Sequence, residues 1–281
     1  MSKVIIASDS TCDLNQELIQ RYQIRIIPLG VTLGEKQYTD GVDITPDDIY
    51  AHYAATGQLP KTSAVNIAEF DDFFRKNTAD GSSIVLFTIS SDMSSTCSNA
   101  KIAAEEYENV YVIDTQSLTT GMGLLVIAAA EMAAVGKSAE EIAAHCTELS
   151  TRIDASFVVD DLEFLHKGGR CSAVAAMGAN LLQLKPCICV KDGKMGVGKK
   201  YRGKFATVLE KYIAEQIGDG SKVDLTRIFI THGGCDPELM DRCVAQVKAA
   251  ADFKEVHLTR TGCTVSSHCG RNTVGILFLR K

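Results

Sequence analysis

The chain has 281 residues and no low-complexity tract, so it is long enough to bury a large core and to form two lobes. Hydrophobic residues make up 46% of the chain and charged residues 23%, a balance that excludes an intrinsically disordered protein. The net charge of -6 argues against nucleic acid as the main partner, because phosphate contacts need a basic face.

The first half of the chain alternates apolar runs with helix signals. We expect strands at residues 4–7, 83–88 and 110–114, and helices at 14–22, at 47–56, from about Thr96, before Gly136, and from Ser138 to about Ser150. Ser10, Thr11 and Asp13 are candidate caps of the first of these helices, and Thr45 and Pro46 provide an N-cap and a first-turn proline for the second. This alternation favours a parallel sheet covered by helices.

The sequence gives no signal for export or membrane insertion. Met1 is followed at once by the first apolar strand, without the hydrophobic region and cleavage site of a secretory signal. The most apolar helix, over residues 122–130, is interrupted by Glu131 before the roughly 20 residues that a membrane span needs. We therefore expect a cytoplasmic protein with no stable membrane insertion.

In the second half the expected strands are spaced further apart, at residues 157–159, 187–190, 227–231, 256–259 and 273–278. The sequence Asp-Gly-Lys at 192–194 suits a hairpin, so antiparallel pairing is expected here. We therefore predict an α/β protein of two lobes. Residues 1–155 form a Rossmann-like lobe with a parallel sheet, and residues 156–281 form an α/β lobe with a mixed sheet.

The ten cysteines include no Cys-x-x-Cys pair. We expect Cys187 and Cys189 to point to opposite faces of one strand, so neither a disulfide framework nor a zinc site is predicted. Buried, unreactive thiols are the expected state. The sequence also lacks a helical histidine pair, and we predict no metal site.

Polar side chains gather where strands lead into helices, which is where α/β sheets usually bind ligands. In the segment LPKTSAVNIAEF, Thr62 and Ser63 precede a helix that Ser63 or Asn66 caps, and capping alone is an alternative explanation for these residues. In the segment TVSSHCGRNTVGILF, His268 lies between a strand and a glycine-containing turn. A lone histidine is more often structural than functional.

The segment TISSDMSSTCSNA brings a cluster of hydroxyl groups to the start of a helix: Ser90, Ser91, Ser94, Ser95 and Thr96. Capping needs one hydroxyl, and five are present. Hydroxyls and free backbone N–H groups at a helix N-terminus bind anions, because the helix dipole adds roughly half a positive charge there. The cluster therefore favours a carboxylate site.

Taken in order, many segments resemble the DegV family of bacterial fatty-acid-binding proteins, of the FakB type. They are DSTCDL, PLGVTL, YTDGVDI, PKTS, SSDMSST, VIDT with TTGMGLLV, VDDLEFLHKGGR, KPCICVKDGKM, YRGK and SSHCG. The resemblance covers about residues 4–278. It implies a lipid carrier rather than an enzyme, with one long-chain fatty acid enclosed between the two lobes and no other cofactor. It also implies a partner fatty-acid kinase that converts the presented carboxylate to an acyl phosphate.

The resemblance also implies roles for individual residues. Thr62 and Ser94 correspond to hydroxyls that hold the fatty-acid carboxylate, and His268 corresponds to a third partner. Ser63 and Ser95 are secondary candidates for the same headgroup. Where relatives tend to have Ser-Gly-Thr, this chain has Ser95 in place of the glycine, which puts the geometry of the headgroup site in question.

Three arginines are also candidates. Arg170 of KGGR and Arg202 of YRGK correspond to residues at the pocket mouth, where the kinase docks. Without the resemblance, a surface salt bridge of Arg170 with a nearby carboxylate explains it equally well. Where relatives tend to have His-x-Gly-Pro-Gly, this chain carries Arg271, which either adds a charge to the headgroup site or points to solvent.

A fatty acid also suits these residue types on physical grounds. Each buried methylene contributes about 0.8 kcal/mol, so the acyl tail supplies a large drive to leave water, limited by the costs of binding. A buried carboxylate is costly unless donors surround it. Thr, Ser and His side chains are suitable donors.

Two enzyme classes are alternatives. A serine hydrolase would use Ser94 as nucleophile and His268 as base, although the chain lacks a Gly-x-Ser-x-Gly elbow. A nucleotide-dependent enzyme would use the segment THGGCDPEL, although the chain lacks a phosphate-binding loop motif. Helix capping by Asp236 and Pro237 explains that segment adequately.

Overall fold

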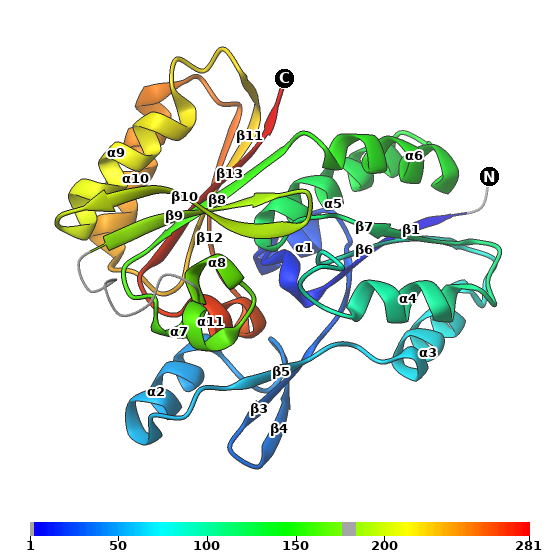
Figure 1. Ribbon diagram of the computed structural model, residues 1–281. Coiled ribbons are helices and arrows are strands. Elements are labelled where there is room, and N and C mark those ends of the chain that lie inside the picture. Colours follow the sequence, from blue (N-terminus) through cyan, green and yellow to red (C-terminus); the bar gives the residue numbers. More distant parts are fainter. Residues whose placement is uncertain (1–2, 176–183) are drawn as a thin grey trace.

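The computed structural model describes residues 3–175 and 184–281, which form two large sheets and one small sheet with helices around them (Figure 1). The first large sheet has the strand order β2-β1-β6-β7 and is parallel throughout. Its strands are β1 (Val4–Asp9), β2 (Arg25–Ile27), β6 (Ser83–Thr88) and β7 (Val110–Asp114). The predicted parallel sheet of the N-terminal half is confirmed.

Alternate residues of the central strands face opposite layers of helices. On one face, Ile6 and Val85 pack against α1 (Gln16–Arg21), α5 (Thr119–Ala134) and α6 (Ala139–Ser150). On the other face, Ala7 and Leu86 pack against α3 (Ile67–Thr78) and α4 (Thr96–Ala104). This period of two is what the pleat of a strand buried on both faces requires.

The helix starts follow the capping chemistry of the sequence. Capping boxes begin α2 (Pro46–Thr56) at Thr45 and α6 at Ser138, as predicted. For α3 the cap is Asn66 and not Ser63. For α1 the cap is Asn15, because the residues expected to cap it form the 3₁₀ helix η1 (Ser10–Cys12) instead.

A small antiparallel sheet with the order β4-β3-β5 was not predicted. It consists of β3 (Gly30–Leu33), β4 (Lys36–Thr39) and β5 (Lys61–Ser63). In it, Val31 lies between Tyr38 and Thr62. Its short strands carry little apolar periodicity, and the 21 residues between β4 and β5, which include α2, separate the partners in sequence. Long-range pairing of this kind leaves no local pattern.

The second large sheet has the order β10-β9-β8-β13-β11-β12 and is mixed, as predicted. Its strands are β8 (Ile153–Val159), β9 (Leu184–Lys191), β10 (Lys194–Arg202), β11 (Val223–His232), β12 (Glu255–Arg260) and β13 (Thr273–Arg280). Only β11 and β12 pair in parallel. The expected hairpin joins β9 to β10. The proposed boundary after residue 155 falls within β8, so this sheet begins three residues before the proposed start of the second lobe.

Two helices, α9 (Phe205–Ile217) and α10 (Pro237–Ala250), cover one face of the second sheet (Figure 1). Cys187 packs in this layer, and Cys189 packs against it. The prediction that these two cysteines point to opposite faces was wrong, because residues two apart on a strand share a face. Their Sγ atoms lie 3.8 Å apart.

The other face of the second sheet is directed toward the first lobe. Helix α5 packs on this face against β11 and β13. Three short helices, α7 (Glu163–Gly168), α8 (Ser172–Ala175) and α11 (Cys263–Cys269), lie near the ends of the strands (Figure 1). We expected His268 between a strand and a glycine-containing turn, but it lies in the mostly buried helix α11. Among the helices in residues 3–175 and 184–281, none combines the length and the hydropathy that crossing a membrane requires.

Candidate functional site

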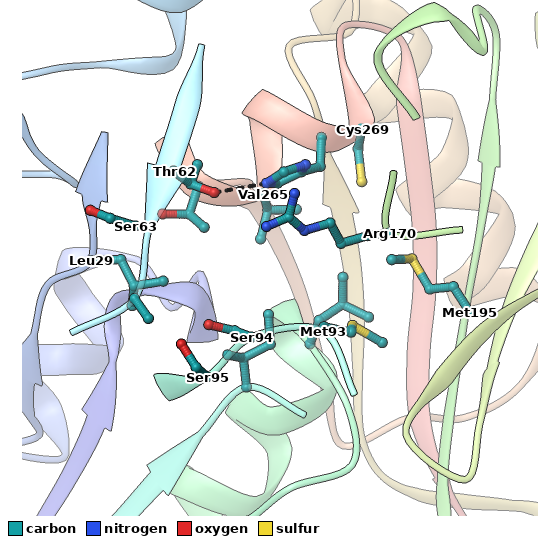
Figure 2. A pocket seen from close by; sticks show the side chains of 15 residues that line it. Leu29, Thr62, Ser63, Met93, Ser94, Ser95, Arg170, Met195, Val265 and Cys269 are labelled. Atoms are coloured by element: carbon teal, nitrogen blue, oxygen red, sulfur yellow. Dashed lines mark hydrogen bonds between the residues drawn. The ribbon is translucent and has the colours of Figure 1, made fainter. Parts of the chain in front are cut away.

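A cavity of about 200 Å³ lies where the first lobe, the small sheet and α11 meet (Figure 2). The first lobe contributes the segments after β6 and before α5, the small sheet contributes β5, and the second lobe contributes α11 and the segment after α7. The cavity is lined by Leu29, Thr62, Ser63, Ala64, Ile89, Met93, Ser94, Ser95, Leu118, Arg170, Met195, Thr264, Val265, His268 and Cys269. Polar groups and apolar groups therefore share one enclosed space.

Thr62 and His268 meet inside this cavity. The Thr62 hydroxyl lies 2.9 Å from Nε2 of His268, and the two residues come from β5 and α11 (Figure 2). The sequence analysis selected both residues, and the structure brings them into direct contact. Thr62 is on a strand, however, and not at a helix N-terminus as the expected helix start implied.

Burial, assisted by the nearby Arg170 cation and opposed by the backbone of Gly168, lowers the pKa of His268 to about 4. The imidazole is therefore neutral at pH 7. Its Nδ1 is buried and has no hydrogen-bond partner among the described residues. A bare acceptor is tolerated there better than an orphaned N–H donor, and this favours the tautomer with the proton on Nε2.

This tautomer fixes the direction of the Thr62 hydroxyl. With Nε2–H donating to Oγ1 of Thr62, the Thr62 proton is free to point into the cavity. The pair then offers an O–H donor that is polarised by a second hydrogen bond behind it. Such a donor suits a carboxylate oxygen and carries no formal charge.

Ser94 occupies the start of α4, on the wall of the cavity that the first lobe supplies. Its Oγ accepts a hydrogen bond from the backbone N–H of Thr96 at 3.2 Å and lies 2.9 Å from the Thr96 hydroxyl. If the buried Thr96 hydroxyl donates to Ser94, the Ser94 proton is available to a ligand. The helix N-terminus beside it favours negative charge.

The remaining hydroxyls of this cluster have different surroundings. Ser90 donates to the carbonyl of Gly193 in the β9–β10 hairpin, and Ser91 donates to Asp114. Ser95 lines the cavity edge with φ of −73° and ψ of −1°. This is ordinary right-handed backbone, so a side chain where relatives tend to have glycine introduces no strain.

Two buried carboxylates hold the N-terminus of α11, the helix that carries His268. Asp40 accepts hydrogen bonds from the backbone N–H groups of Cys263 at 2.8 Å and Thr264 at 3.1 Å. Asp13 accepts from the backbone N–H of Gly262 at 2.7 Å. These bonds supply the acceptors that the first turn of a helix lacks. The carboxylates therefore position His268 from a distance.

Sequence reasoning missed these two residues as site residues. Burial raises the pKa of Asp13 well above its ordinary value, and the Thr119 hydroxyl opposes this by donating to the carboxylate. Asp40 also accepts from the Ser10 hydroxyl at 3.0 Å. Both lie in the segments DSTCDL and YTDGVDI. An acidic residue in an otherwise apolar or turn-forming segment was the available signal.

The two glycines before Arg170 have separate uses. A Cβ atom at Gly168 would lie 2.8 Å from Nδ1 of His268, so the end of α7 approaches the imidazole only because this residue lacks a side chain. Gly169 ends α7 in the left-handed region, with φ of 68°. Together they direct the following arginine to the cavity.

Arg170 lines the cavity and is exposed to solvent, with its guanidinium directed toward the side of Thr62 (Figure 2). Its Nη1 donates to the carbonyl of Gly168 at 3.0 Å. Within the described residues it forms no ion pair. The carboxylates of Asp160 and Glu163 instead pair with Lys185 and Lys167. The alternative that Arg170 serves a surface salt bridge therefore finds no support.

The structure does not bring the other candidate arginines to the cavity. Arg271 lies 3.5 Å from the carboxylate of Asp47 and 4.8 Å from the ring centre of Tyr50. Arg202 is the last residue of β10 and is exposed. Ser63 is exposed and lines the edge of the cavity beside Thr62.

The two enzyme alternatives do not fit the geometry. Nε2 of His268 bonds to Thr62, and no hydrogen bond joins His268 to Ser94 among the described residues. In the other segment, Asp236 accepts from the backbone of Leu239 and caps α10. The described parts of the chain also contain no cluster of three or more potential metal ligands.

A second, narrower cavity of about 20 Å³ continues from the first. The two cavities share Leu118, Val265 and Cys269, which form the neck between them. The second cavity lies between α5, α11 and the second sheet, and Phe157 and Leu277 are among its apolar lining residues. The polar site thus lies next to a small apolar cavity between the lobes, with Leu118, Val265 and Cys269 lining both.

Comparisons with known proteins show the family and the fold. The model of the family described as "Uncharacterised protein, DegV family" matches residues 3–281. A DegV domain-containing protein of Clostridium acetobutylicum is 33% identical over 287 residues, covering 100% of both chains. The solved structure of a fatty-acid-binding DegV family protein from Thermus thermophilus is similar with a TM-score of 0.90 and 28% identity, over 99% of this chain and 100% of that one. A stearic-acid-binding protein from Eubacterium ventriosum has a TM-score of 0.84 and 29% identity, over 100% of this chain and 99% of that one.

Proposed function

This chain belongs to the DegV family, and on that premise we propose that it binds one long-chain fatty acid in the passage between its lobes, residues 1–155 and 156–281. The observation that carries the proposal is the Thr62–His268 hydrogen bond at the polar end of an apolar cavity. The solved relatives that are described as fatty-acid-binding proteins share the fold over nearly the whole chain.

The headgroup end suits an ionised carboxylate. The hydroxyls of Thr62 and Ser94 donate to its two oxygens, and His268 orients the Thr62 donor from behind. Hydrogen bonds to a charged acceptor contribute about 1.5–3 kcal/mol each. Arg170 adds a cation at the open side, so the head is bound without being isolated from a partner protein.

The tail follows the neck of Leu118, Val265 and Cys269 into the second cavity. That cavity has a volume of about 20 Å³, so the side chains of its walls must move apart to admit an acyl chain. At about 0.8 kcal/mol for each buried methylene, an acyl chain of roughly 16 carbons offsets this rearrangement and the cost of association.

The proposed biochemical role is that of a cytoplasmic carrier for a fatty-acid kinase. The carboxylate lies beside exposed Arg170, so a partner enzyme can reach it while the tail stays enclosed. The kinase transfers a phosphoryl group to the carboxylate and forms an acyl phosphate, and the fork of Arg170 suits phosphate and carboxylate equally. We also propose that Arg202, which is exposed at the end of β10 and lies outside the cavity lining, contacts the kinase.

The direct test is extraction of the purified full-length protein with organic solvent, followed by mass spectrometry. We expect close to one fatty acid for each chain. A protein that carries none, and that takes up none when incubated with palmitate or oleate, would contradict the proposal. Turnover of a p-nitrophenyl ester that depends on Ser94 would favour the hydrolase alternative.

A further inference from the structure

Cys187 and Cys189 form a thiol pair on the face of β9 that α9 covers. Their Sγ atoms lie 3.8 Å apart. All ten cysteines lie in the described parts of the chain, and Cys189 alone is not buried. Cys187 is 1% exposed. One accessible thiol therefore stands next to one protected thiol.

We propose that this pair is a redox modification site, in which hydrogen peroxide oxidises Cys189 and Cys187 then closes a reversible disulfide with it. An accessible thiol beside a resolving thiol is the arrangement that redox-sensing proteins use. The site is separate from the fatty-acid cavity, so it extends beyond the proposed function.

The neighbouring strand leaves the outer thiol uncovered. Gly196 of β10 is the register partner of Cys189, and a Cβ atom there would meet nothing within 4 Å. Further along the same strand, a Cβ atom at Gly198 would lie 2.9 Å from Sγ of Cys189. A side chain at Gly198 would displace the thiol. The two glycines thus keep space above Cys189 through which a small oxidant can reach the sulfur.

The local charges favour a thiolate at the outer position. The hydrogen bond from the Cys187 thiol lowers the pKa of Cys189, and Arg280 contributes in the same direction, while partial burial and Asp154 oppose it. The same pairing and burial raise the pKa of Cys187. The thiolate is the nucleophilic form of cysteine, so Cys189 attacks the oxidant and Cys187 retains its proton.

The chemistry is balanced by the two thiols and the peroxide. Cys189 first releases its proton. The resulting thiolate attacks one peroxide oxygen, the O–O bond breaks, and Cys189 becomes a sulfenic acid as hydroxide leaves and takes up the released proton to form water. Sγ of Cys187 then attacks Sγ of Cys189, the S–O bond breaks, and the departing hydroxide takes the Cys187 proton. The protein loses two electrons and two protons, and the peroxide is reduced to two waters.

The geometry also makes the disulfide easy to reverse. Residues two apart on a strand have Cα atoms about 6.5 Å apart, near the upper limit of about 6.8 Å for a disulfide. Closing the bond therefore strains β9, and strained disulfides are the readily reduced ones.

The pair lies on the opposite face of the sheet from the cavity. Ile188, between the two cysteines, points to the core that includes cavity residues, whereas Cys187 packs with Tyr201 and Tyr212 under α9. Oxidation should therefore leave the amount of bound fatty acid unchanged. This makes failure of the inference distinguishable from failure of the proposed function.

The test is peptide mapping of the reduced full-length protein after a short exposure to hydrogen peroxide. Remaining thiols are blocked in denaturant before digestion. We expect the peptide containing both cysteines to lose two hydrogens and both alkylation sites, and thioredoxin to reverse this loss. Oxidation of Cys189 beyond the sulfenic acid with Cys187 still free, a disulfide between Cys189 residues of two copies, or an unchanged peptide would each overturn the proposal.

Matched variants separate the two roles. C187S should stop at a sulfenic acid on Cys189 that dimedone traps, and C189S should lose the reaction altogether. C235S, which removes another thiol of the second lobe, should form the disulfide as the unsubstituted protein does. If a variant fails to fold, the peptide map of the unsubstituted protein decides alone. Disulfide formation in C189S would overturn the assignment of the attacking thiol.

Discussion

Asp40 accepts two hydrogen bonds from Thr264, one from its backbone N–H at 3.1 Å and one from its hydroxyl at 2.6 Å. Thr264 lies in the first turn of α11, and His268 lies in the last. A carboxylate in the first lobe therefore fixes the helix that presents the imidazole to Thr62. The headgroup site depends on this contact between the lobes.

Replacing Asp40 with Asn should weaken both the fold and the site. The amide retains one acceptor, but its NH₂ group faces backbone N–H donors, so at least one buried donor of α11 loses its partner. We expect the free energy of unfolding to fall by about 1–3 kcal/mol, with less fatty acid retained after purification. Asp241, exposed on α10, provides the control D241N. Denaturant unfolding equal in D40N and D241N would contradict the role of Asp40.

The variants T62V and S94A test the two donors of the headgroup site. Each removes one hydroxyl with little change of shape, so each should lower the affinity for a long-chain fatty acid about tenfold to a hundredfold, as expected for a hydrogen bond to a charged group. The melting temperature of S94A should change little, whereas T62V also removes the acceptor of Nε2–H of His268 and should lower the free energy of unfolding by about 1–3 kcal/mol. S98A, which alters an exposed residue of α4, should bind normally. Affinities of T62V and S94A equal to that of S98A would remove these residues from the site.

The pH dependence of stability should reveal the buried imidazole. In the folded protein the pKa of His268 is about 4, below its ordinary value of 6.5, so the unfolded chain binds the proton first as the pH falls. The contribution to stability is fully present above pH 6.5 and is lost progressively down to pH 4. It amounts to about 3 kcal/mol at most.

The variant H268Q should lack this dependence. Asp9, whose pKa burial raises to about 6, has the opposite effect because its folded form binds the proton first. That effect is present in both proteins and cancels in their difference. Denaturant unfolding at pH 4.5 and pH 7 measures the difference in stability between the unsubstituted protein and H268Q. Parallel pH profiles for the two proteins would show that His268 is not buried in its neutral form.

Gly168 should be more sensitive to substitution than a glycine with open space. In G168A the new methyl group would lie only 2.8 Å from Nδ1 of His268, which is closer than van der Waals contact allows. It would therefore push the imidazole away from Thr62. We expect at least a tenfold loss of fatty-acid affinity. G196A, at a position where a Cβ atom meets nothing within 4 Å, should bind normally. Equal affinities of the two variants would show that the close approach of α7 has no part in binding.

Replacing Arg170 should reduce phosphoryl transfer by the partner kinase more than it reduces fatty-acid binding. The side chain is exposed at the cavity mouth, so R170A should retain at least half of the bound fatty acid while phosphoryl transfer by the kinase falls at least tenfold. R271A, which changes the arginine paired with Asp47, should support normal transfer. The rates of phosphoryl transfer with R170A and with R271A are measured with radiolabelled ATP and excess fatty acid. Normal transfer with R170A would rule out its role at the interface with the kinase.

The sequence predicted those parts of the fold that carry local signals. The capping boxes at Thr45 and Ser138 defined helix starts, and the Asp-Gly turn at 192–193 defined a hairpin, because each pattern lies within a few residues. The small sheet and α11 were missed. Both owe their structure to distant partners: β5 pairs with β3, and α11 begins where Asp13 and Asp40 accept its backbone N–H groups.

The candidate site residues also divide into those that the sequence could identify and those whose position depends on contacts with distant segments. Thr62, Ser94, Arg170 and His268 were identified from the ordered resemblance, and all four line one cavity. Arg271 could not be placed, because its contact with Asp47 joins segments far apart in sequence. The prediction for the cysteine pair was wrong for a simpler reason. Residues two apart on a strand point to the same face, and Cys187 and Cys189 were assigned to opposite faces.

The most direct test of the account is a crystal structure of the full-length protein purified with its lipid or incubated with palmitate. The account predicts an extended alkyl chain through the neck of Leu118, Val265 and Cys269, with its carboxylate within hydrogen-bond distance of Thr62 and Ser94. A passage filled by the protein's own side chains, or a carboxylate bound elsewhere, would contradict it.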